Sequence, residues 1–227
     1  MAINRLQHAR KTALLRAGAG AGAGLALTAT FGLASPALAD VPEKAPQAAR
    51  VASAPQTQQA NKISVTASQL LQLAKAQVGT SENAYGGGTK FQQWYANSQR
   101  ALETIRRDGG TRRGYLNAPW CAMFVSWVGE QLGARPQVGW DAWTVAHARW
   151  FVANKRWGDA PKPGAVVFFS WSGGKSLSSI RHVGFVVKDN GNGTISTIEG
   201  NTGNGRVEER VRSKSDVVGY GYPEYAG

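Results

Sequence analysis

The chain has 227 residues, of which 42% are hydrophobic, and its 26 Lys and Arg against 14 Asp and Glu give a formal net charge of +12 at pH 7. This length can bury one sizeable core but hardly two, so we expect one globular domain with additional segments. Since no Arg-rich tract or RNA-binding motif accompanies the charge, we expect no nucleic-acid partner. The basic excess instead favours contact with anionic polymers or lipid head groups, with an ordinary soluble surface as the alternative.

Residues 1–39 have the pattern of a secretory signal peptide. Four basic residues precede an uncharged stretch that ends in Ala37-Leu38-Ala39, and we expect cleavage after Ala39. The stretch is long enough to span a membrane, so an uncleaved anchor is the alternative, although its Gly-Ala alternation makes it weakly hydrophobic. Cleavage would remove four basic residues and no acidic one, which lowers the net charge from +12 to +8.

The next segment, residues 40–62, is rich in Ala, Pro and Gln, which predicts a disordered linker. A helix is then expected from Thr66, which forms a capping-box pattern with Gln69, to a stop at Gly79. A weaker helical pattern surrounds Phe91.

A central apolar helix is expected to begin at Pro119, which suits a first helical position, and to end at Gly133. Its hydrophobic face is formed by Cys121, Phe124, Val125, Val128 and Leu132. A further helix is expected over residues 142–154, with Asp141 as a cap. It contains His147, for which we expect a partly exposed surface position.

Beyond Pro163-Gly164 the hydrophobic pattern changes to that of strands. Strands are expected over residues 165–170, 182–188, 194–199, 206–211 and 217–222. The sequence Asn190-Gly191-Asn192-Gly193 predicts a hairpin between the second and third of them. Helices followed by antiparallel strands predict an α+β domain.

Cys121 is the only cysteine of the chain, so no intramolecular disulfide can form. It is expected in the first turn of the central helix, where free backbone amides and the helix dipole stabilise a thiolate. A thiolate is what nucleophilic attack on an amide requires. The alternative is a buried cysteine that merely begins the apolar face.

A thiol nucleophile needs a base, and His182 is the better placed of the two histidines outside the signal peptide. It opens a strand on which it shares a face with Gly184, and we expect Gly184 to leave space beside the imidazole. Across the hairpin, Glu199 or Asn201 can reach and orient His182. The alternatives are a structural histidine, an exposed strand carboxylate and an ordinary turn residue.

Together the segments PWCAMFVSW, PKPGAVVFF, RHVGFVVKDNGNGTIST and IEGNT resemble, in this order, the CHAP family of cysteine- and histidine-dependent amidohydrolases and peptidases. The resemblance covers about residues 66–225. It implies a papain-like α+β fold, in which N-terminal helices pack on a C-terminal antiparallel β-sheet, and a catalytic domain over residues 63–227.

This resemblance also implies roles for four residues. Cys121 matches the nucleophile, His182 the base, Glu199 the acidic position that orients the histidine, and Asn201 the accompanying polar position. The implied substrate is peptidoglycan, cut either between N-acetylmuramic acid and L-alanine by an amidase or within the peptides by an endopeptidase. The alternative is a non-catalytic cell-wall-binding protein on the same scaffold.

Aromatic residues near these motifs are candidates for a substrate groove, with core packing as the alternative. They are Trp120, Trp127, Trp140 and Trp143, and Trp120 is preferred because it precedes Cys121. We expect no metal and no other cofactor, since one cysteine and two histidines stand at no recognised ligand spacing. We expect a monomer, secreted or associated with the cell wall, whose partners are peptidoglycan and, through charge, anionic wall polymers.

Overall fold

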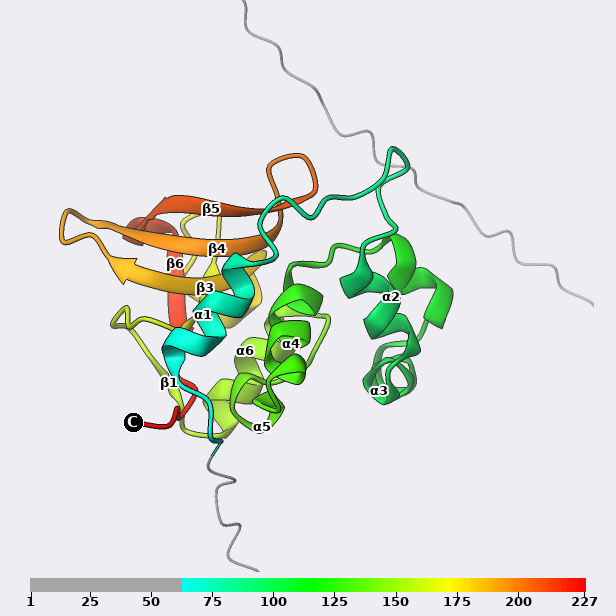
Figure 1. The fold of residues 1–227 in the computed structure, drawn as a ribbon, viewed down its shortest axis with the longest axis horizontal. Helices are drawn as coiled ribbons and strands as arrows, with labels where there is room; N and C mark the ends of the chain where they lie inside the picture. The colour runs from blue at the N-terminus through cyan, green and yellow to red at the C-terminus, as the bar shows by residue number, and fades with distance from the viewer. Residues whose placement is uncertain (1–62) are drawn as a thin grey trace, which may run out of the picture. The chain divides into compact units, whose positions relative to one another are not determined.

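The computed structural model describes residues 63–227, which form helices followed by an antiparallel sheet (Figure 1). The predicted signal peptide, its cleavage site and the predicted linker lie outside the described residues. Within residues 63–227, no helix has the length and hydrophobicity needed to cross a membrane.

In the described part of the chain, all the α-helices come before the first strand in the sequence. They are α1 (Ala67–Lys75), α2 (Lys90–Asn97), α3 (Gln99–Asp108), α4 (Cys121–Gln131), α5 (Arg135–Val138) and α6 (Thr144–Ala153), with short 3₁₀ helices at Arg112–Asn117, Leu177–Ser179 and Lys214–Asp216. The predicted capping box begins α1, because the side chain of Thr66 accepts from the backbone N–H of Gln69 and the Gln69 side chain accepts from that of Thr66.

The strands form one sheet with the order β1-β6-β2-β3-β4-β5. They are β1 (Trp157–Gly158), β2 (Val166–Phe169), β3 (His182–Asp189), β4 (Thr194–Thr202), β5 (Arg206–Ser213) and β6 (Val217–Gly221). All neighbouring strands pair antiparallel. The expected α+β, papain-like fold class is therefore confirmed, and β1 is an additional strand that the sequence pattern did not indicate.

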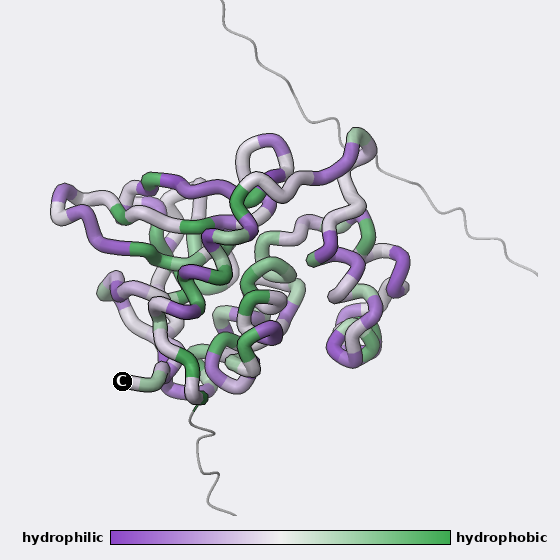
Figure 2. Tube along the Cα trace, viewed as in Figure 1, coloured by the Kyte–Doolittle hydropathy of each residue, from purple (hydrophilic) through white to green (hydrophobic). Residues whose placement is uncertain are grey.

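Helix α4 packs against strands β3 and β4, and this contact holds the main core together. Phe124 of α4 meets Phe185 of β3 edge to face, with ring centroids 6.1 Å apart. Hydrophobic residues run along α4 in Figure 2, as burial on several sides requires. The predicted central helix is confirmed, although its first residue is Cys121 and not Pro119.

The approach of α4 to β4 depends on Gly200. A Cβ atom at this position would lie 2.6 Å from Cβ of Phe124 and 2.8 Å from Cζ3 of Trp120. Both distances are too short for carbon atoms, so any larger residue would push the start of α4 away from the strand.

Asp141 does not occupy the expected helix cap. Helix α6 begins at Thr144, and Asp141 accepts a hydrogen bond from the backbone N–H of Trp143 at 2.9 Å. Its carboxylate also receives Arg100 at 2.9 Å and Arg107 at 2.8 Å, both from α3. These ion pairs connect α3 to the segment between α4 and α6.

Candidate active site

Cys121 is the first residue of α4, and it is 5% exposed. No side chain caps this helix at Trp120, the residue before it. Because the first N–H groups of a helix have no partner within the helix, they and the positive end of the helix dipole are available to a negative charge at Cys121. The helix start thus favours an anion at the sulfur.

His182 is the first residue of β3 and is 6% exposed. Its Nε2 atom shares a hydrogen bond of 2.8 Å with Oε2 of Glu199 on β4. The side chain of Cys121 lies near enough to the imidazole to raise the pKa of His182. With Nε2 occupied by Glu199, Nδ1 is the ring nitrogen left for the thiol.

Burial and the neighbouring side chains have opposite effects on the pKa values of His182 and Glu199. Burial on its own lowers the pKa of His182, but the hydrogen bonds and charges of Cys121 and Glu199 outweigh it and raise that pKa to about 9. For Glu199, which is fully buried, burial raises the pKa, whereas hydrogen bonds from Arg212 and His182 lower it to about 2. At neutral pH the site therefore holds an imidazolium against a carboxylate.

Arg212 of β5 belongs to this arrangement, and the sequence pattern did not identify it. Its Nη2 lies 2.6 Å from Oε2 of Glu199, and its Nε lies 2.9 Å from Oε1. The Thr197 hydroxyl donates to the same Oε1 at 2.6 Å. Since Arg212 pairs with Ile195 in the β4–β5 register, alternation puts it on the face of β4 that carries Thr197 and Glu199.

The sequence predicts open space beside the imidazole at Gly184, but in the structure this space is filled. A Cβ atom there would lie 2.7 Å from Cγ of Glu199 and 2.9 Å from the carbonyl oxygen of Ile198. The glycine instead makes room for the Glu199 side chain to pass across β3 toward His182.

Asn201 lies near this group but does not join it. It is partly exposed, has a left-handed backbone with φ of 55°, and lies where the β4–β5 register shifts between Glu199 and Thr202. Among the hydrogen bonds of residues 63–227, none connects Asn201 to His182. The structure thus brings Cys121, His182 and Glu199 together and leaves Asn201 outside their contacts.

Trp120 does not face a groove. Its side chain is fully buried, stacks on Phe91 with centroids 5.3 Å apart, and donates from Nε1 to Oε1 of Glu82 at 2.8 Å. The expectation of a substrate-binding Trp120 is therefore wrong for this conformation, because the ring anchors the chain that leads into α4.

His147 is also not where the sequence suggested. It is fully buried instead of partly exposed, with Nε2 2.7 Å from the carbonyl oxygen of Val138 and its ring stacked on Phe151. Burial lowers its pKa, so it is neutral at pH 7. Its role is to pack α6 in the core, away from Cys121.

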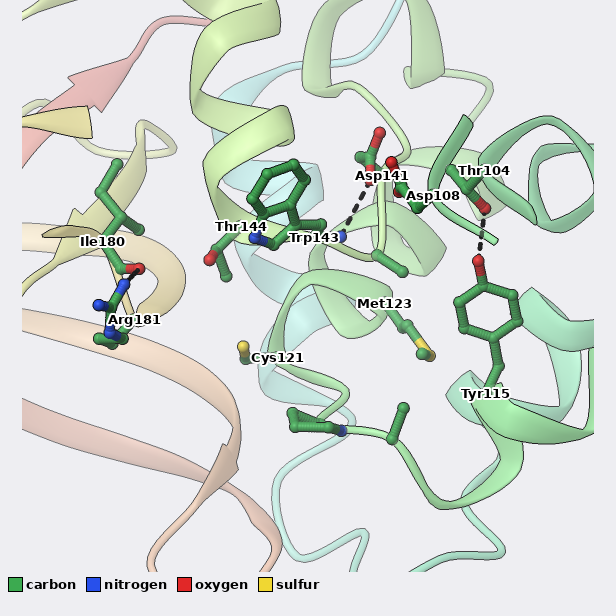
Figure 3. A pocket seen from close by; sticks show the side chains of 13 residues that line it. Thr104, Asp108, Tyr115, Cys121, Met123, Asp141, Trp143, Thr144, Ile180 and Arg181 are labelled. Atoms are coloured by element: carbon green, nitrogen blue, oxygen red, sulfur yellow. Dashed lines mark hydrogen bonds between the residues drawn. The ribbon is translucent and has the colours of Figure 1, made fainter. Parts of the chain in front are cut away.

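A cavity of about 340 Å³ opens beside Cys121 (Figure 3). Its lining residues are Thr104, Asp108, Tyr115, Ala118, Pro119, Cys121, Met123, Asp141, Ala142, Trp143, Thr144, Ile180 and Arg181. Trp143 is 47% exposed, so of the four tryptophans considered from the sequence it is the one that faces this cavity. Among the described residues, no group of three or more His, Cys, Asp or Glu is placed to hold a metal ion.

A cysteine at a helix start, a histidine at the start of an adjacent strand and a buried carboxylate behind it define a papain-like domain of the cysteine–histidine class. Residues 112–201 match the family model of the CHAP domain, and CHAP domains are typically hydrolase domains. The matched segment contains Cys121, His182 and Glu199, whereas Arg212 lies beyond it. Comparisons with curated proteins and with solved structures found no match.

Proposed function

We propose that the protein is a cysteine hydrolase that cleaves an amide bond in peptidoglycan. The observation that carries the proposal is the placement of Cys121 at the start of α4 together with the hydrogen bond by which Glu199 holds His182. The CHAP match supports peptidoglycan as the substrate. Cys121 would be the nucleophile, His182 the base and acid, and Glu199 the group that orients and stabilises the imidazolium.

The chemistry would proceed in two steps. In the first, the Cys121 thiolate attacks the amide carbonyl carbon, and the backbone N–H of Cys121 hydrogen-bonds the developing oxyanion. The C–N bond then breaks while protonated His182 gives its proton to the departing amine, which leaves a thioester. In the second, neutral His182 takes a proton from water as the water attacks the thioester, and the sulfur leaves as a thiolate.

The cavity beside Cys121 is the place where the substrate would lie. Its lining combines apolar side chains, including Trp143 and Met123, with Arg181, the residue before the base. Such a mixture suits a peptide or lactyl-peptide segment of the wall polymer. Both an N-acetylmuramoyl-L-alanine amidase and a peptidoglycan endopeptidase are consistent with these residues.

We further propose that residues 1–39 direct export and that the mature protein acts outside the cell or at the cell wall, as a monomer. The basic excess of the chain would favour contact with anionic wall polymers near the substrate. In this proposal Asn201 has the role of the polar position that accompanies the acidic residue in the family. It acts near Glu199 and makes no hydrogen bond to His182.

The test is Cys121→Ala. Incubated with purified peptidoglycan, the wild-type protein should release new amino groups, and the variant should do so at least about 10³-fold more slowly because the nucleophile is gone. Its thermal unfolding should resemble that of the wild type. If the folded variant kept near-normal activity, the mechanism would be wrong, and wild-type binding without release of amines would favour a non-catalytic cell-wall-binding protein.

A further inference from the structure

The guanidinium of Arg212 is held in one position by several contacts. Besides its two short contacts to Glu199, its Nε lies 3.3 Å from the second carboxylate oxygen, Oε2. Its Nη2 also donates to Oγ1 of Thr202 at 3.0 Å. The side chain of Arg212 is 19% exposed, so water competes little for these donors.

The ring of Trp171 lies over the guanidinium of Arg212. The Cζ atom of Arg212 lies 4.9 Å from the centre of the Trp171 ring, which stacks on Phe169 at 5.4 Å. The same Trp171 ring lies 5.6 Å from the imidazole of His182. Arg212 and His182 therefore approach Glu199 as two cations under one aromatic cover.

A carboxylate with no exposed surface is costly to keep ionised unless cations and hydrogen-bond donors face it. His182 supplies one donor to Glu199 from Nε2, but its positive charge is lost when Nδ1 gives up its proton during the reaction proposed above. Arg212 keeps its charge throughout, because a guanidinium does not deprotonate in proteins. Its fork of donors also fixes the plane of the carboxylate, which one point charge cannot do.

We propose that Arg212 is a positioning residue, which keeps Glu199 ionised and oriented toward His182 through the whole reaction. This inference rests on the proposed function, although Arg212 touches neither the substrate cavity nor the thiol. The other charges that act on Arg212 are those of Glu208 and Asp216.

The first test compares Arg212→Gln with the wild type in the assay of amine release. We expect kcat to fall at least about tenfold with KM changed less than about twofold, since the substrate contacts remain. The acid limb of the pH profile should move up by about one pH unit, because Glu199 would protonate more readily without the guanidinium. Arg212→Lys should lie between the two proteins, since it restores the charge without the fork.

Arg210→Gln is the matched control, because Arg210 is on the same strand and its guanidinium pairs with Glu208 at 3.3 Å instead of with Glu199. It should leave kcat and both limbs of the profile unchanged. Equal effects of the two substitutions would overturn the proposal, since they would show a general loss of positive charge. If Arg212→Gln does not fold, Arg212→Lys decides, and a wild-type kcat in that variant would overturn the orienting role.

A measurement independent of activity separates this inference from the proposed function. Carbon-13 NMR of the labelled Glu199 carboxyl should report a pKa at least about one pH unit higher in Arg212→Gln than in the wild type. An unmoved pKa overturns the inference even in an active enzyme. A raised pKa in a protein that releases no amine from peptidoglycan would support it while rejecting the function.

Discussion

At neutral pH the buried Glu199 keeps its charge because His182 and Arg212 both donate to it. That charge acts back on His182, and it is one of the causes that raise the pKa of the imidazole to about 9. In the mechanism proposed above, a protonated His182 delivers a proton to the departing amine. The carboxylate and the base are therefore coupled, and their titrations belong to the group as a whole.

Glu199→Gln tests this coupling. The amide retains the shape of the side chain but removes its charge, so the pKa of His182 should fall. Because activity requires the protonated ring, the alkaline limb of kcat/KM, expected near the pKa of about 9, should move to lower pH in the variant. The measurement is the pH dependence of amine release between neutral pH and the alkaline limit of protein stability.

Asn201→Ala is the comparison, because Asn201 lies two residues further along the same strand and makes no hydrogen bond to His182. It should leave the alkaline limb in place and reduce activity less than Glu199→Gln does. The opposite order would transfer the orienting role to Asn201.

The residues of the site differed in how visible they were in the sequence. Cys121 and His182 begin a helix and a strand, and local patterns indicate such positions. Arg212 acts on Glu199 across the β4–β5 strand pair, in which Arg212 lies opposite Ile195, and no local sequence pattern specifies that register. Trp120 is adjacent to Cys121 in the sequence, but it is fully buried and does not line the cavity that Cys121 lines, because adjacency in the sequence does not determine which way a side chain faces.

In helix α6, burial determines how His147 affects the stability of the fold. Its His147 lies between Phe151 and the carbonyl of Val138, and the Nδ1 atom of the ring has no hydrogen-bond partner. A buried neutral imidazole becomes a charge without sufficient partners once it is protonated. The helix thus carries a group that opposes folding in acid.

We expect the free energy of unfolding to decrease as the pH falls below about 6.5, the ordinary value of histidine. Burial lowers the pKa of His147 in the folded protein, so between the two pKa values the unfolded chain binds the additional proton and is favoured. In His147→Gln this contribution is absent, so its stability should decline less between pH 7 and pH 5. The measurement is urea unfolding at a series of pH values.

The glutamine variant should itself be about 1–3 kcal/mol less stable at pH 7, because the ring packing and its hydrogen bond are disturbed. Its activity at that pH should be preserved, since His147 lies away from Cys121. A pH dependence of stability identical to that of the wild type would show that His147 does not titrate on unfolding.

Helix α3 was not expected from the sequence, and its composition explains why. Only Ala101 and Thr104 are buried along its length, so it lacks a continuous apolar face. What begins it is Ser98, whose hydroxyl accepts from the N–H of Ala101 at 3.1 Å. What attaches it is the pair of arginines on Asp141, a long-range contact that hydrophobic periodicity does not report.

For the whole molecule, the change from helical to alternating periodicity was sufficient to predict the α+β class. The order of the strands was beyond sequence reasoning, because β6 is inserted between β1 and β2 although it comes last in the chain. Such an arrangement depends on which strand edges meet in space. Local residues specify the strands but not their neighbours.

The export proposed above concerns the whole chain and predicts a defined mature protein. If the Ala37-Leu38-Ala39 site is cleaved, the mature chain begins at Asp40 and retains the basic excess of the remaining residues. Intact-mass measurement on protein from the culture supernatant should give the mass of residues 40–227. Recovery of only the full-length chain from the membrane fraction would support the uncleaved anchor instead.

The close contact at Gly200 has a consequence for how this scaffold can diversify. Helix α4 and strand β4 touch where there is no room for a methyl group, so a larger residue there would separate Cys121 from His182. The opposite wall of the cavity includes Tyr115 and Thr104, joined by a hydroxyl contact of 2.7 Å, and Asp108. Under the proposed function, substitutions on that side of the cavity can alter which peptidoglycan fragment is accepted without moving Cys121. Substrate range can thus evolve on one side of the cavity while the reaction chemistry is conserved on the other.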